Sequence, residues 1–428
     1  MTYKIHVGNN LDILPTLPDN SVDSIVTDPP YELGFMGKKW DSTGIAYSVE
    51  LWEQCLRVLK PGGHLLAFSG SRTYHRQVVA IEDAGFEIRD MISWISNKTF
   101  PKSLNISKAI DKAAGAEREV IGTRKQRANS DSSEVKFNAS SGEVESITAP
   151  ATEDAKKWNG WGTALKPTVE PIVMARKPLE GTVANNVLTY GTGGLNIDAS
   201  RIGTETITIN TFDNGAKPFG DAVGEPFTSR QQEGRWPANV ILDEDAAEIV
   251  DEQSGQTKSP KPYIAEGYKD TSMFGLGGVN HSNEYGDSGG ASRFFYLAKA
   301  SKRDRNEGLD ELPDGYWELQ GHQGNKAEDG ISNKSGTGTV AGFSKNYHPT
   351  VKPTTLMSYL IKLVTPPGGI VLDPFTGSGS TGKAAILDGF DFVGIEMTEE
   401  YLPIIEGRLA YAEKVFAEKK DTETEKLF

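Results

Sequence analysis

Apolar and polar positions alternate with two different periods along the first hundred residues. Residues 4–7 and 22–27 are short runs rich in β-branched side chains; a Gly-Asn turn follows the first and two prolines follow the second. Between residues 49 and 60, apolar side chains recur at helical spacing until Pro-Gly-Gly stops the repeat. The same criteria predict strands at residues 64–68 and 87–95 and a helix at residues 74–84. This alternation predicts an α/β fold with a mostly parallel sheet covered by helices on both faces.

The middle of the chain is far less regular. Residues 98–157 are predicted to form a basic and flexible insert, because Lys and Arg exceed Asp and Glu in residues 98–127, and residues 124–157 are rich in Ser, Thr, Asn and Glu with little periodicity. Residues 158–180 return to the pattern of a core strand. Residues 181–345 are rich in Gly, Ser and Asn and contain apolar islands at 240–242 and 294–297. We therefore expect a large loop-rich insert within the α/β core.

Regular periodicity returns near the C-terminal end. The predicted elements there are a helix at residues 356–364, strands at residues 370–372 and 391–395, and a helix at residues 401–414. The charged residues 413–428 are predicted to form a tail whose last residues are frayed.

Composition narrows the class of protein. The chain has 428 residues, a formal net charge of −14 and one cysteine, which excludes an internal disulfide and a cysteine-based zinc cluster. The six histidines show no ligand spacing, so no metal site is predicted. The longest apolar runs are too short to cross a membrane and the first ten residues lack a signal-peptide core. We expect a cytoplasmic protein without a membrane segment.

Local charge differs from this acidic total. Residues 98–127 carry eight Lys and Arg against three Asp and Glu. A second basic cluster contains Lys299, Lys302, Arg303 and Arg305. Each cluster is either a contact for nucleic-acid phosphates or a solvated face, and Lys102 and Arg303 are the candidate phosphate contacts.

A glycine-rich turn directly follows the strand at residues 370–372. It reads Asp373-Pro374-Phe375-Thr376-Gly377-Ser378-Gly379-Ser380-Thr381. Glycines let a backbone approach a ligand where a Cβ would clash, and Glu396 at the end of the next strand can accept hydrogen bonds from two ribose hydroxyls. The turn lacks the lysine of a P-loop and the spacing of a dinucleotide site. A methyl donor with an adenosine and a methionine end fits better; the alternative is a turn that binds no ligand.

A second motif, Asp28-Pro29-Pro30-Tyr31, ends the strand at residues 22–27. Two prolines stiffen the backbone and remove two donors, so the Pro29 carbonyl and the Asp28 carboxylate can both accept hydrogen bonds from an amine. Such acceptors suit the exocyclic amino group of a base, and Tyr31 can stack on the base plane. In a duplex the base must first be flipped out. The alternative is a surface turn with a capping aspartate.

These residues resemble the amino-methyltransferases of DNA, which methylate adenine N6 or cytosine N4. The two motifs carry the resemblance together with His348-Pro349-Thr350-Val351-Lys352-Pro353, which is similar to the family's segment before the donor site. The order of the motifs resembles the permuted beta group. The resemblance implies a Rossmann-like methyltransferase fold, S-adenosylmethionine as the cofactor and double-stranded DNA as the partner.

The resemblance also implies roles for individual residues. The catalytic residues would be Asp28, Pro29, Pro30 and Tyr31. The cofactor-binding residues would be Asp373, Phe375, Gly377, Gly379, Ser380 and Glu396, with Thr350 and Lys352 near the methionine end and Asn9 as a further contact. Asn9 and Ser380 depart from the family pattern, which has Asp and commonly Thr there; the charge is lost at position 9 and the hydroxyl is kept at position 380.

The same resemblance divides the chain. Residues 1–97 would form the first part of the catalytic core and residues 346–412 its S-adenosylmethionine-binding part. Residues 181–345 would form a candidate target-recognition region. The loop at residues 32–41 is predicted to close over the flipped base, with a hydrophobic anchor as the alternative role of Trp40.

The methylated atom and the substrate are left open by these motifs. Asp28 stands where cytosine N4 enzymes tend to have Ser, which favours adenine over the alternative, cytosine N4. Methylation at cytosine carbon 5 is excluded, because it needs a reactive thiolate and Cys55 lies on an apolar helix face. The chain could also methylate RNA or a protein amide, or it could be a noncatalytic nucleic-acid-binding protein with a vestigial donor pocket. A partner restriction nuclease and a homodimer are equally open.

Overall fold

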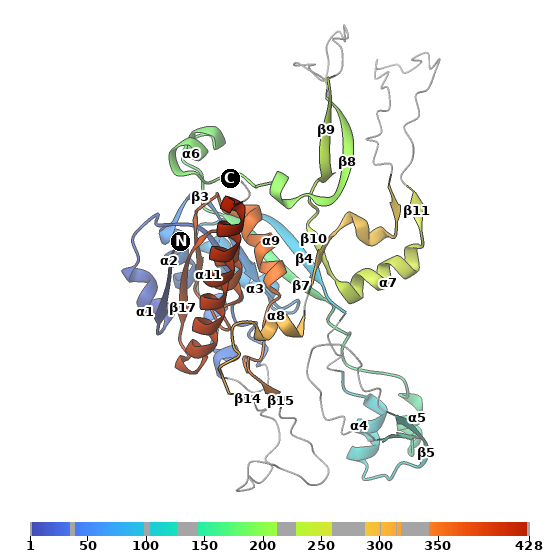
Figure 1. Cartoon of the computed structure of the whole chain (residues 1–428). Coiled ribbons are helices and arrows are strands. Elements are labelled where there is room, and N and C mark those ends of the chain that lie inside the picture. Colours follow the sequence, from blue (N-terminus) through green and yellow to red (C-terminus); the bar gives the residue numbers. More distant parts are fainter. Residues whose placement is uncertain are drawn as a thin grey trace, which may run out of the picture.

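A large mixed sheet forms the centre of the molecule (Figure 1). The computed structural model describes residues 2–34, 39–97, 103–125, 144–211, 228–258, 287–299, 301–313, 315–317 and 342–425. Within these residues the sheet has nine strands, in the spatial order β1 (Tyr3–Val7), β17 (Asp391–Glu396), β16 (Ile370–Asp373), β2 (Val22–Thr27), β3 (Leu59–Phe68), β7 (Val169–Arg176), β4 (Glu87–Ile95), β10 (Val240–Asp243) and β13 (Tyr296–Ala298). Strand β7 pairs antiparallel with β3 and β4, and the remaining pairs are parallel. The prediction of a mostly parallel sheet is confirmed.

Helices cover both faces of this sheet. Side chains of successive strand residues point to opposite faces, so Ile25 packs in one core and Val26 in the other. Helices α2 (Val49–Val58) and α3 (Tyr74–Asp83) bury their apolar faces in the first core. Helices α9 (Thr354–Val364), α10 (Ser380–Leu387) and α11 (Leu402–Glu425) form the second core, where α9 and α11 lie in front of the sheet in Figure 1. The two-face arrangement expected from the alternating pattern is therefore present.

The remaining elements lie outside the nine-stranded sheet. The helices are α1 (Asn10–Ile13), α4 (Ile106–Ala113), α5 (Glu153–Lys157), α6 (Val183–Tyr190), α7 (Glu244–Ser254) and α8 (Lys302–Asn306). The strands form two-stranded sheets: β5 (Val120–Lys125) with β6 (Val144–Thr148), β8 (Ile202–Thr211) with β9 (Thr228–Arg235), β11 (Thr257–Lys258) with β12 (Ser288–Gly289), and β14 (Gly315–Trp317) with β15 (Gly342–Ser344). Single turns of 3-10 helix occur at Leu14–Thr16, Lys39–Ser42, Ile45–Tyr47, Asp198–Ser200, Ala291–Phe294 and Glu399–Tyr401.

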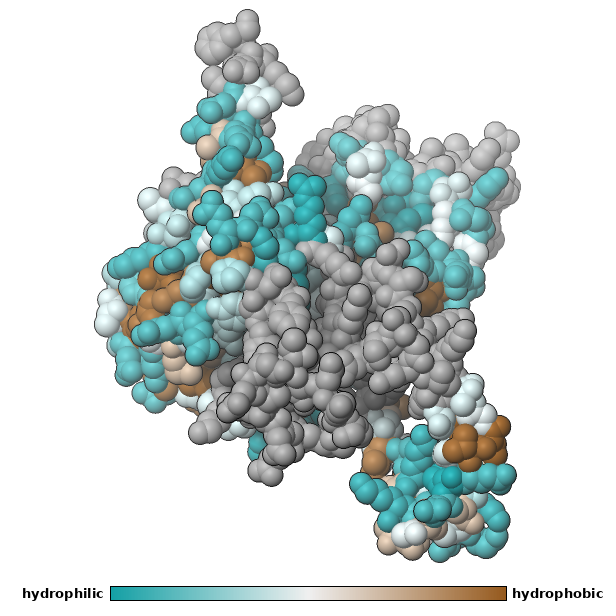
Figure 2. All heavy atoms as spheres, turned by 60° about the horizontal axis from the view of Figure 1, so that its bottom comes forward, coloured by the Kyte–Doolittle hydropathy of each residue, from teal (hydrophilic) through white to brown (hydrophobic). Residues whose placement is uncertain are grey.

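Part of the predicted flexible insert is folded. Helices α4 and α5 and the β5–β6 hairpin form a small module at the lower right of Figure 1. The buried Asp111 carboxylate joins them, because it accepts hydrogen bonds from the Ala151 and Thr152 amides at 3.0 Å and pairs with Arg118 at 2.5 Å. Figure 2 shows apolar side chains on the surface of this module, and Trp161 there is 58% exposed. The sequence pattern missed this module because the contacts of Asp111 with Ala151 and Thr152 join residues about 40 positions apart in the chain.

The region at residues 181–345 is not separate from the central sheet. Its two apolar islands form β10 and β13, which pair with each other at one edge of the sheet, and β10 also pairs with β4. Helix α8 from the same region contacts α10 through the ion pair of Asp304 with Lys383. The loop-rich insert therefore contributes two strands and a helix to the core.

Helix α11 is longer than the predicted helix at residues 401–414. It continues to Glu425, through residues expected to fray. These last turns are mostly Glu, Lys, Thr and Ala without Gly or Pro, and several of these residues favour helix even when exposed. No helix among the described residues has the length and apolar content to cross a membrane.

Candidate active site

The two predicted motifs meet at the carboxyl ends of neighbouring strands. Strand β2 ends at Thr27, just before Asp28, and strand β16 ends at Asp373; the two strands pair in parallel with Leu372 opposite Ile25. The Thr27 hydroxyl donates a hydrogen bond to Asp373 Oδ1 at 2.6 Å. Parallel strands place both ends on the same edge of the sheet, where ligands bind in open α/β folds. The amine motif and the glycine-rich turn therefore share one site.

Asp28 offers one engaged and one free oxygen. Its Oδ2 lies 2.9 Å from the Lys352 ammonium, whereas its Oδ1 is buried and has no hydrogen-bond partner among the described residues. Burial raises the pKa of Asp28 above its ordinary value, and the positive charge of Lys352 opposes that rise. A buried acceptor without a partner costs stability, so Asp28 Oδ1 is available to accept a hydrogen bond.

Lys352 lies at the acceptor site. Its ammonium is 3.1 Å from Glu170 on β7 and donates to the Tyr31 hydroxyl at 2.9 Å. The Tyr31 hydroxyl in turn donates to Glu170 at 2.6 Å. The ammonium also lies over three aromatic rings, 5.2 Å from the centroid of Tyr31, 4.8 Å from Phe68 and 5.9 Å from Trp94. Lys352 was assigned to the methionine end by resemblance, and its contacts in the structure are with Asp28, Tyr31 and Glu170.

Glu170 was missed by the sequence reasoning. It is an acidic residue near the start of strand β7, in the run Val169-Glu170-Pro171-Ile172-Val173. An acid in a core strand of this kind is costly unless it is paired. That signal was available, but the sequence could not indicate Lys352 and Tyr31 as its partners.

The glycine-rich turn wraps around Glu396. The Gly377 amide donates to Glu396 Oε2 at 2.7 Å, and the Thr398 amide donates to Oε1 at 2.8 Å. Gly377 has a φ of +54° and Gly379 a φ of +75°, which L side chains rarely adopt. Burial raises the pKa of Glu396, and these amides oppose the rise. The carboxylate therefore sits at the turn with lone pairs left to accept further hydrogen bonds.

Asp373 anchors the turn from inside. Its Oδ1 accepts from the Thr27 hydroxyl and from the Phe375 amide at 3.0 Å, and its Oδ2 accepts from the Thr381 hydroxyl at 2.6 Å. Asp373 is 2% exposed, and burial raises its pKa to about 6. All of these contacts are with other residues of the protein, so Asp373 stabilises the conformation of the turn. The Phe375 side chain packs half-buried against the core.

His348 lies against the turn from the segment before α9. A Cβ at Gly377 would lie 3.1 Å from His348 Nε2. Burial lowers the pKa of His348 to about 3, so its ring is neutral at physiological pH. Thr350 is held beside it, because the Thr350 amide lies 3.3 Å from His348 Nδ1.

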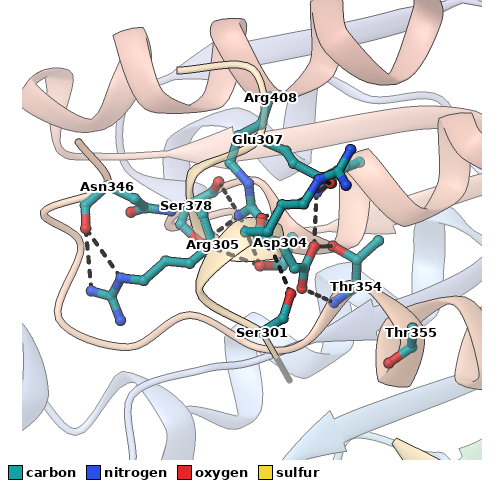
Figure 3. Close-up of polar contacts among 12 residues, drawn as sticks. Ser301, Asp304, Arg305, Glu307, Asn346, Thr354, Thr355, Ser378 and Arg408 are labelled. Atoms are coloured by element: carbon teal, nitrogen blue, oxygen red, sulfur yellow. Dashed lines mark hydrogen bonds and ion pairs between the residues drawn. The ribbon is translucent and has the colours of Figure 1, made fainter. Parts of the chain in front are cut away.

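Two buried cations support the turn from behind. Arg408 of α11 donates to the Ser378 carbonyl at 2.8 Å and to the Ser380 hydroxyl at 3.0 Å (Figure 3). Lys383 of α10 is fully buried and pairs with Asp304 at 2.8 Å and with Glu307 at 2.9 Å. Lys383 is the first lysine after the turn along the chain, and its ammonium is already paired with Asp304 and Glu307. It is therefore not available to a phosphate group, in agreement with the sequence argument against a P-loop.

Helix α8 also fastens the segment that carries His348. Figure 3 shows Arg305 reaching toward Asn346 and Asp304 toward Thr354. Arg305 donates to the His348 carbonyl at 2.7 Å, and Asp304 Oδ2 accepts from the Thr354 amide at 2.9 Å. The sequence placed Arg305 in a basic surface cluster and singled out neither Asp304 nor Arg408. Arg303 of the same helix projects outward, with its side chain 84% exposed.

Asn9 stands directly before helix α1. Its side chain caps α1 by accepting from the Leu11 amide at 3.1 Å. The next residue, Asn10, is buried and donates to the Pro374 carbonyl at 3.4 Å, while the Gly8 amide donates to the Glu396 carbonyl at 2.9 Å. The opening strand thus reaches the turn through Gly8 and Asn10.

Lys102, a candidate phosphate contact, lies outside the described residues, and so do residues 35–38 of the predicted closing loop. Hydrogen bonds join the two described ends of that loop. The Asp41 carboxylate accepts from the Glu32 amide at 2.9 Å, and the Glu32 carboxylate accepts from the Gly44 amide at 2.8 Å.

A buried carboxylate oxygen without a partner among the described residues and a glycine-rich turn thus lie at the ends of neighbouring parallel strands, where α/β enzymes bind their ligands. The chain belongs to the N6/N4 DNA methylase family: a family model described as "DNA methylase" matches residues 22–407. The predicted family is thereby confirmed. Among the described residues no cluster of three His, Cys, Asp or Glu could hold a metal ion.

Individual relatives match over shorter stretches. The chain is 46% identical over 72 residues to the DNA adenine methyltransferase YhdJ of Escherichia coli K12, covering 17% of this chain and 24% of YhdJ. It is 30% identical over 152 residues to the type II methyltransferase M.HindIII of Haemophilus influenzae, covering 35% of this chain and 38% of that protein. These matches span between a quarter and two-fifths of the relatives' length. The solved structure of TTHA0409 from Thermus thermophilus, complexed with S-adenosyl-L-methionine, is 16% identical over 96% of this chain and 94% of that chain, with a TM-score of 0.37.

Proposed function

We propose that this protein is a site-specific DNA methyltransferase that transfers a methyl group from S-adenosylmethionine to the N6 amino group of adenine in a flipped-out base. One observation carries the proposal above all. The free acceptor Asp28 Oδ1 and the glycine-rich turn lie at neighbouring strand ends that Thr27 and Asp373 join directly. Transfer of a small group needs the two reactants within contact distance and in line, which this arrangement allows.

The residues of the turn fit the proposed donor. Glu396 can accept hydrogen bonds from ribose hydroxyls, and the glycine backbone at position 377 leaves open the space that a Cβ would fill beside His348. His348 is neutral, so it adds no positive charge where a cationic sulfonium would bind. When bound, S-adenosylmethionine supplies an electrophilic methyl group. In this proposal Asp373, Phe375, Gly377, Gly379, Ser380 and Glu396 form the donor site, together with Thr350.

The acceptor residues supply the complementary chemistry. Asp28 Oδ1 and the Pro29 carbonyl would accept the two hydrogens of the exocyclic amine, which favours a lone pair localised on nitrogen. Tyr31 would stack on the base and offset part of the cost of extrusion, since base–aromatic stacking contributes about 1–3 kcal/mol. Asp28, ionised beside Lys352, can also take the proton that the methylated amine releases.

Adenine is favoured by two points. Position 28 is an aspartate, and the relative that is 46% identical over 72 residues is named a DNA adenine methyltransferase. We infer double-stranded DNA as the substrate and residues 181–345 as the region that selects the target sequence. The name of M.HindIII, a type II methyltransferase, supports a place beside a restriction nuclease.

Mass spectrometry of nucleosides tests this proposal. DNA from cells that express the wild-type protein should contain N6-methyladenine, and DNA from cells that express Asp28→Ala should not. N4-methylcytosine without N6-methyladenine would overturn the choice of base. Methylation confined to RNA or protein would overturn DNA as the substrate.

A second measurement separates an enzyme from a binding protein with a vestigial pocket. Purified Asp28→Ala should bind S-adenosylmethionine and DNA as the wild type does but transfer no methyl group. A wild-type protein that binds both and transfers nothing would contradict the enzyme assignment. Single-molecule sequencing of DNA from the expressing host would then report the recognised sequence.

A further inference from the structure

Lys352 is held at the acceptor site from several directions. Two carboxylates flank its ammonium, Asp28 at 2.9 Å and Glu170 at 3.1 Å, and three aromatic rings enclose it. Its side chain is only 9% exposed. A buried ammonium in this setting persists only because the two carboxylates compensate for its lost hydration. Burial lowers the pKa of Lys352, but Asp28 and Glu170 outweigh this effect and raise it, so the group stays charged.

Asp28 depends on that charge. The carboxylate follows the end of β2 with its side chain only 20% exposed, and this partial loss of hydration by itself would favour the neutral acid. A neutral Asp28 would carry a proton on one oxygen and would no longer act as a pure acceptor toward an amine. Lys352 occupies Oδ2 and leaves Oδ1 without a partner among the described residues. One contact therefore does two things: it stabilises the ionised form and determines which oxygen remains free.

We propose that Lys352 and Glu170 are positioning residues for methyl transfer, in which Lys352 keeps Asp28 ionised with Oδ1 free for the target amine and Glu170 holds Lys352 in place. The proposal rests on the function proposed above and deepens it at the same site. Tyr31 belongs to the same arrangement, because its hydroxyl accepts from Lys352 and donates to Glu170. The stacking ring is thereby fixed by the same ammonium and carboxylate.

Substitutions of the two charged neighbours of Asp28 should have opposite effects on its ionisation. The groups that face it are Lys352 before α9, Glu170 on β7, Tyr31 on its own turn and Asp373 on β16. Lys352 favours the ionised form of Asp28, whereas Glu170, which carries a like charge, disfavours it. Removing Lys352 should therefore make Asp28 harder to ionise, and removing the charge of Glu170 should not.

The test is the pH profile of kcat/KM for DNA methylation at saturating donor. In Lys352→Met the acidic midpoint should move upward by about 1–3 pH units, because the opposite charge beside the carboxylate is lost. In Lys352→Arg the positive charge remains, so the midpoint should stay near that of the wild type even if the plateau falls. In Glu170→Gln the plateau should fall, because Lys352 and Tyr31 lose the carboxylate that they share, while the midpoint should stay or move downward, because Lys352 still pairs with Asp28 and a like charge beside Asp28 is removed.

Lys60→Met is the matched control. Lys60 forms an ion pair of 2.6 Å with Asp23 at the other end of β2, away from the site. Its pH profile should coincide with that of the wild type. Calorimetric titration with S-adenosylmethionine reports folding of every variant, since the donor turn does not include Lys352 or Glu170. Should Lys352→Met fail to bind the donor, Lys352→Arg and Glu170→Gln still decide the question, because an acidic midpoint that moves upward in either variant contradicts the inference.

Two outcomes overturn the inference. One is a loss of rate in Lys352→Met that is equal at every pH, and the other is an upward midpoint in Glu170→Gln. A wild-type protein that methylates no base would instead overturn the proposed function. Because the wild type is measured first, the two failures are distinguishable.

Discussion

Asp373→Asn tests the anchor of the glycine-rich turn by stability alone. The substitution removes the charge and keeps the shape. The Asn carbonyl oxygen can still accept from the Thr27 hydroxyl and the Phe375 amide, and the Thr381 hydroxyl can turn to accept from the new amide. The fold should therefore survive, and the effect of the charge can be measured by itself.

The magnitude follows from the pKa of Asp373. Burial raises it from an ordinary 3.8 to about 6. Such a rise corresponds to about 3 kcal/mol, because each pKa unit is worth about 1.4 kcal/mol. The folded state favours the neutral acid, so this contribution to stability is fully present below pH 3.8 and is lost as the pH rises through about 6. Asp373→Asn lacks this loss, so its stability relative to the wild type should increase by about 3 kcal/mol between pH 4 and pH 7.

Urea unfolding at a series of pH values measures this difference. The two curves of unfolding free energy against pH should diverge between pH 4 and pH 7, with the variant gaining on the wild type. Thr27→Val is the matched comparison: it removes a hydrogen bond that lowers the pKa of Asp373, so its stability should fall more steeply with pH than that of the wild type. Parallel curves for Asp373→Asn and the wild type would refute the reasoning.

Three further predictions follow from the same geometry. Gly377→Val should abolish binding of S-adenosylmethionine in calorimetric titration, because its Cβ would lie 3.1 Å from His348 Nε2 at a φ of +54°; unchanged affinity would remove the turn from the donor site. Lys383→Met should lower the free energy of unfolding by roughly 3–5 kcal/mol, because it leaves Asp304 and Glu307 without their buried partner; an unchanged melting temperature would contradict this. Cys55 should react with a thiol reagent only after urea unfolding, because burial raises the pKa of its thiol; rapid reaction of the native protein would show that the α2 face is accessible.

The sequence predicted the α/β core because its long elements have clear periods. The strand at residues 22–27 and the helix that begins at Val49 were placed within a few residues, since each buries a whole face. Strands β10 and β13 were visible only as apolar islands. Strands of four and three residues carry too few alternating positions to indicate a partner, and the pairing of β10 with β4 depends on contacts across the fold.

The site could be predicted as far as its chemistry is local. Asp28 and the glycine-rich turn are motifs in which neighbouring residues act together, so short stretches of sequence reveal them. Glu170 acts only through Lys352, which is far away along the chain, and no period links the two. Arg408 likewise supports Ser380 from a different helix. Residues that act through distant partners become visible only when the chain is folded.

The place of β10 and β13 in the central sheet limits how hybrid enzymes can be built. A chimaera that exchanged the whole of residues 181–345 for the corresponding part of a relative would also remove two sheet strands and helix α8, which supports the donor turn. A graft confined to the hairpin of β8 and β9, between Ile202 and Arg235, would spare them all. If residues 181–345 select the target sequence, as proposed above, attempts to change it by transplantation should therefore begin with that hairpin.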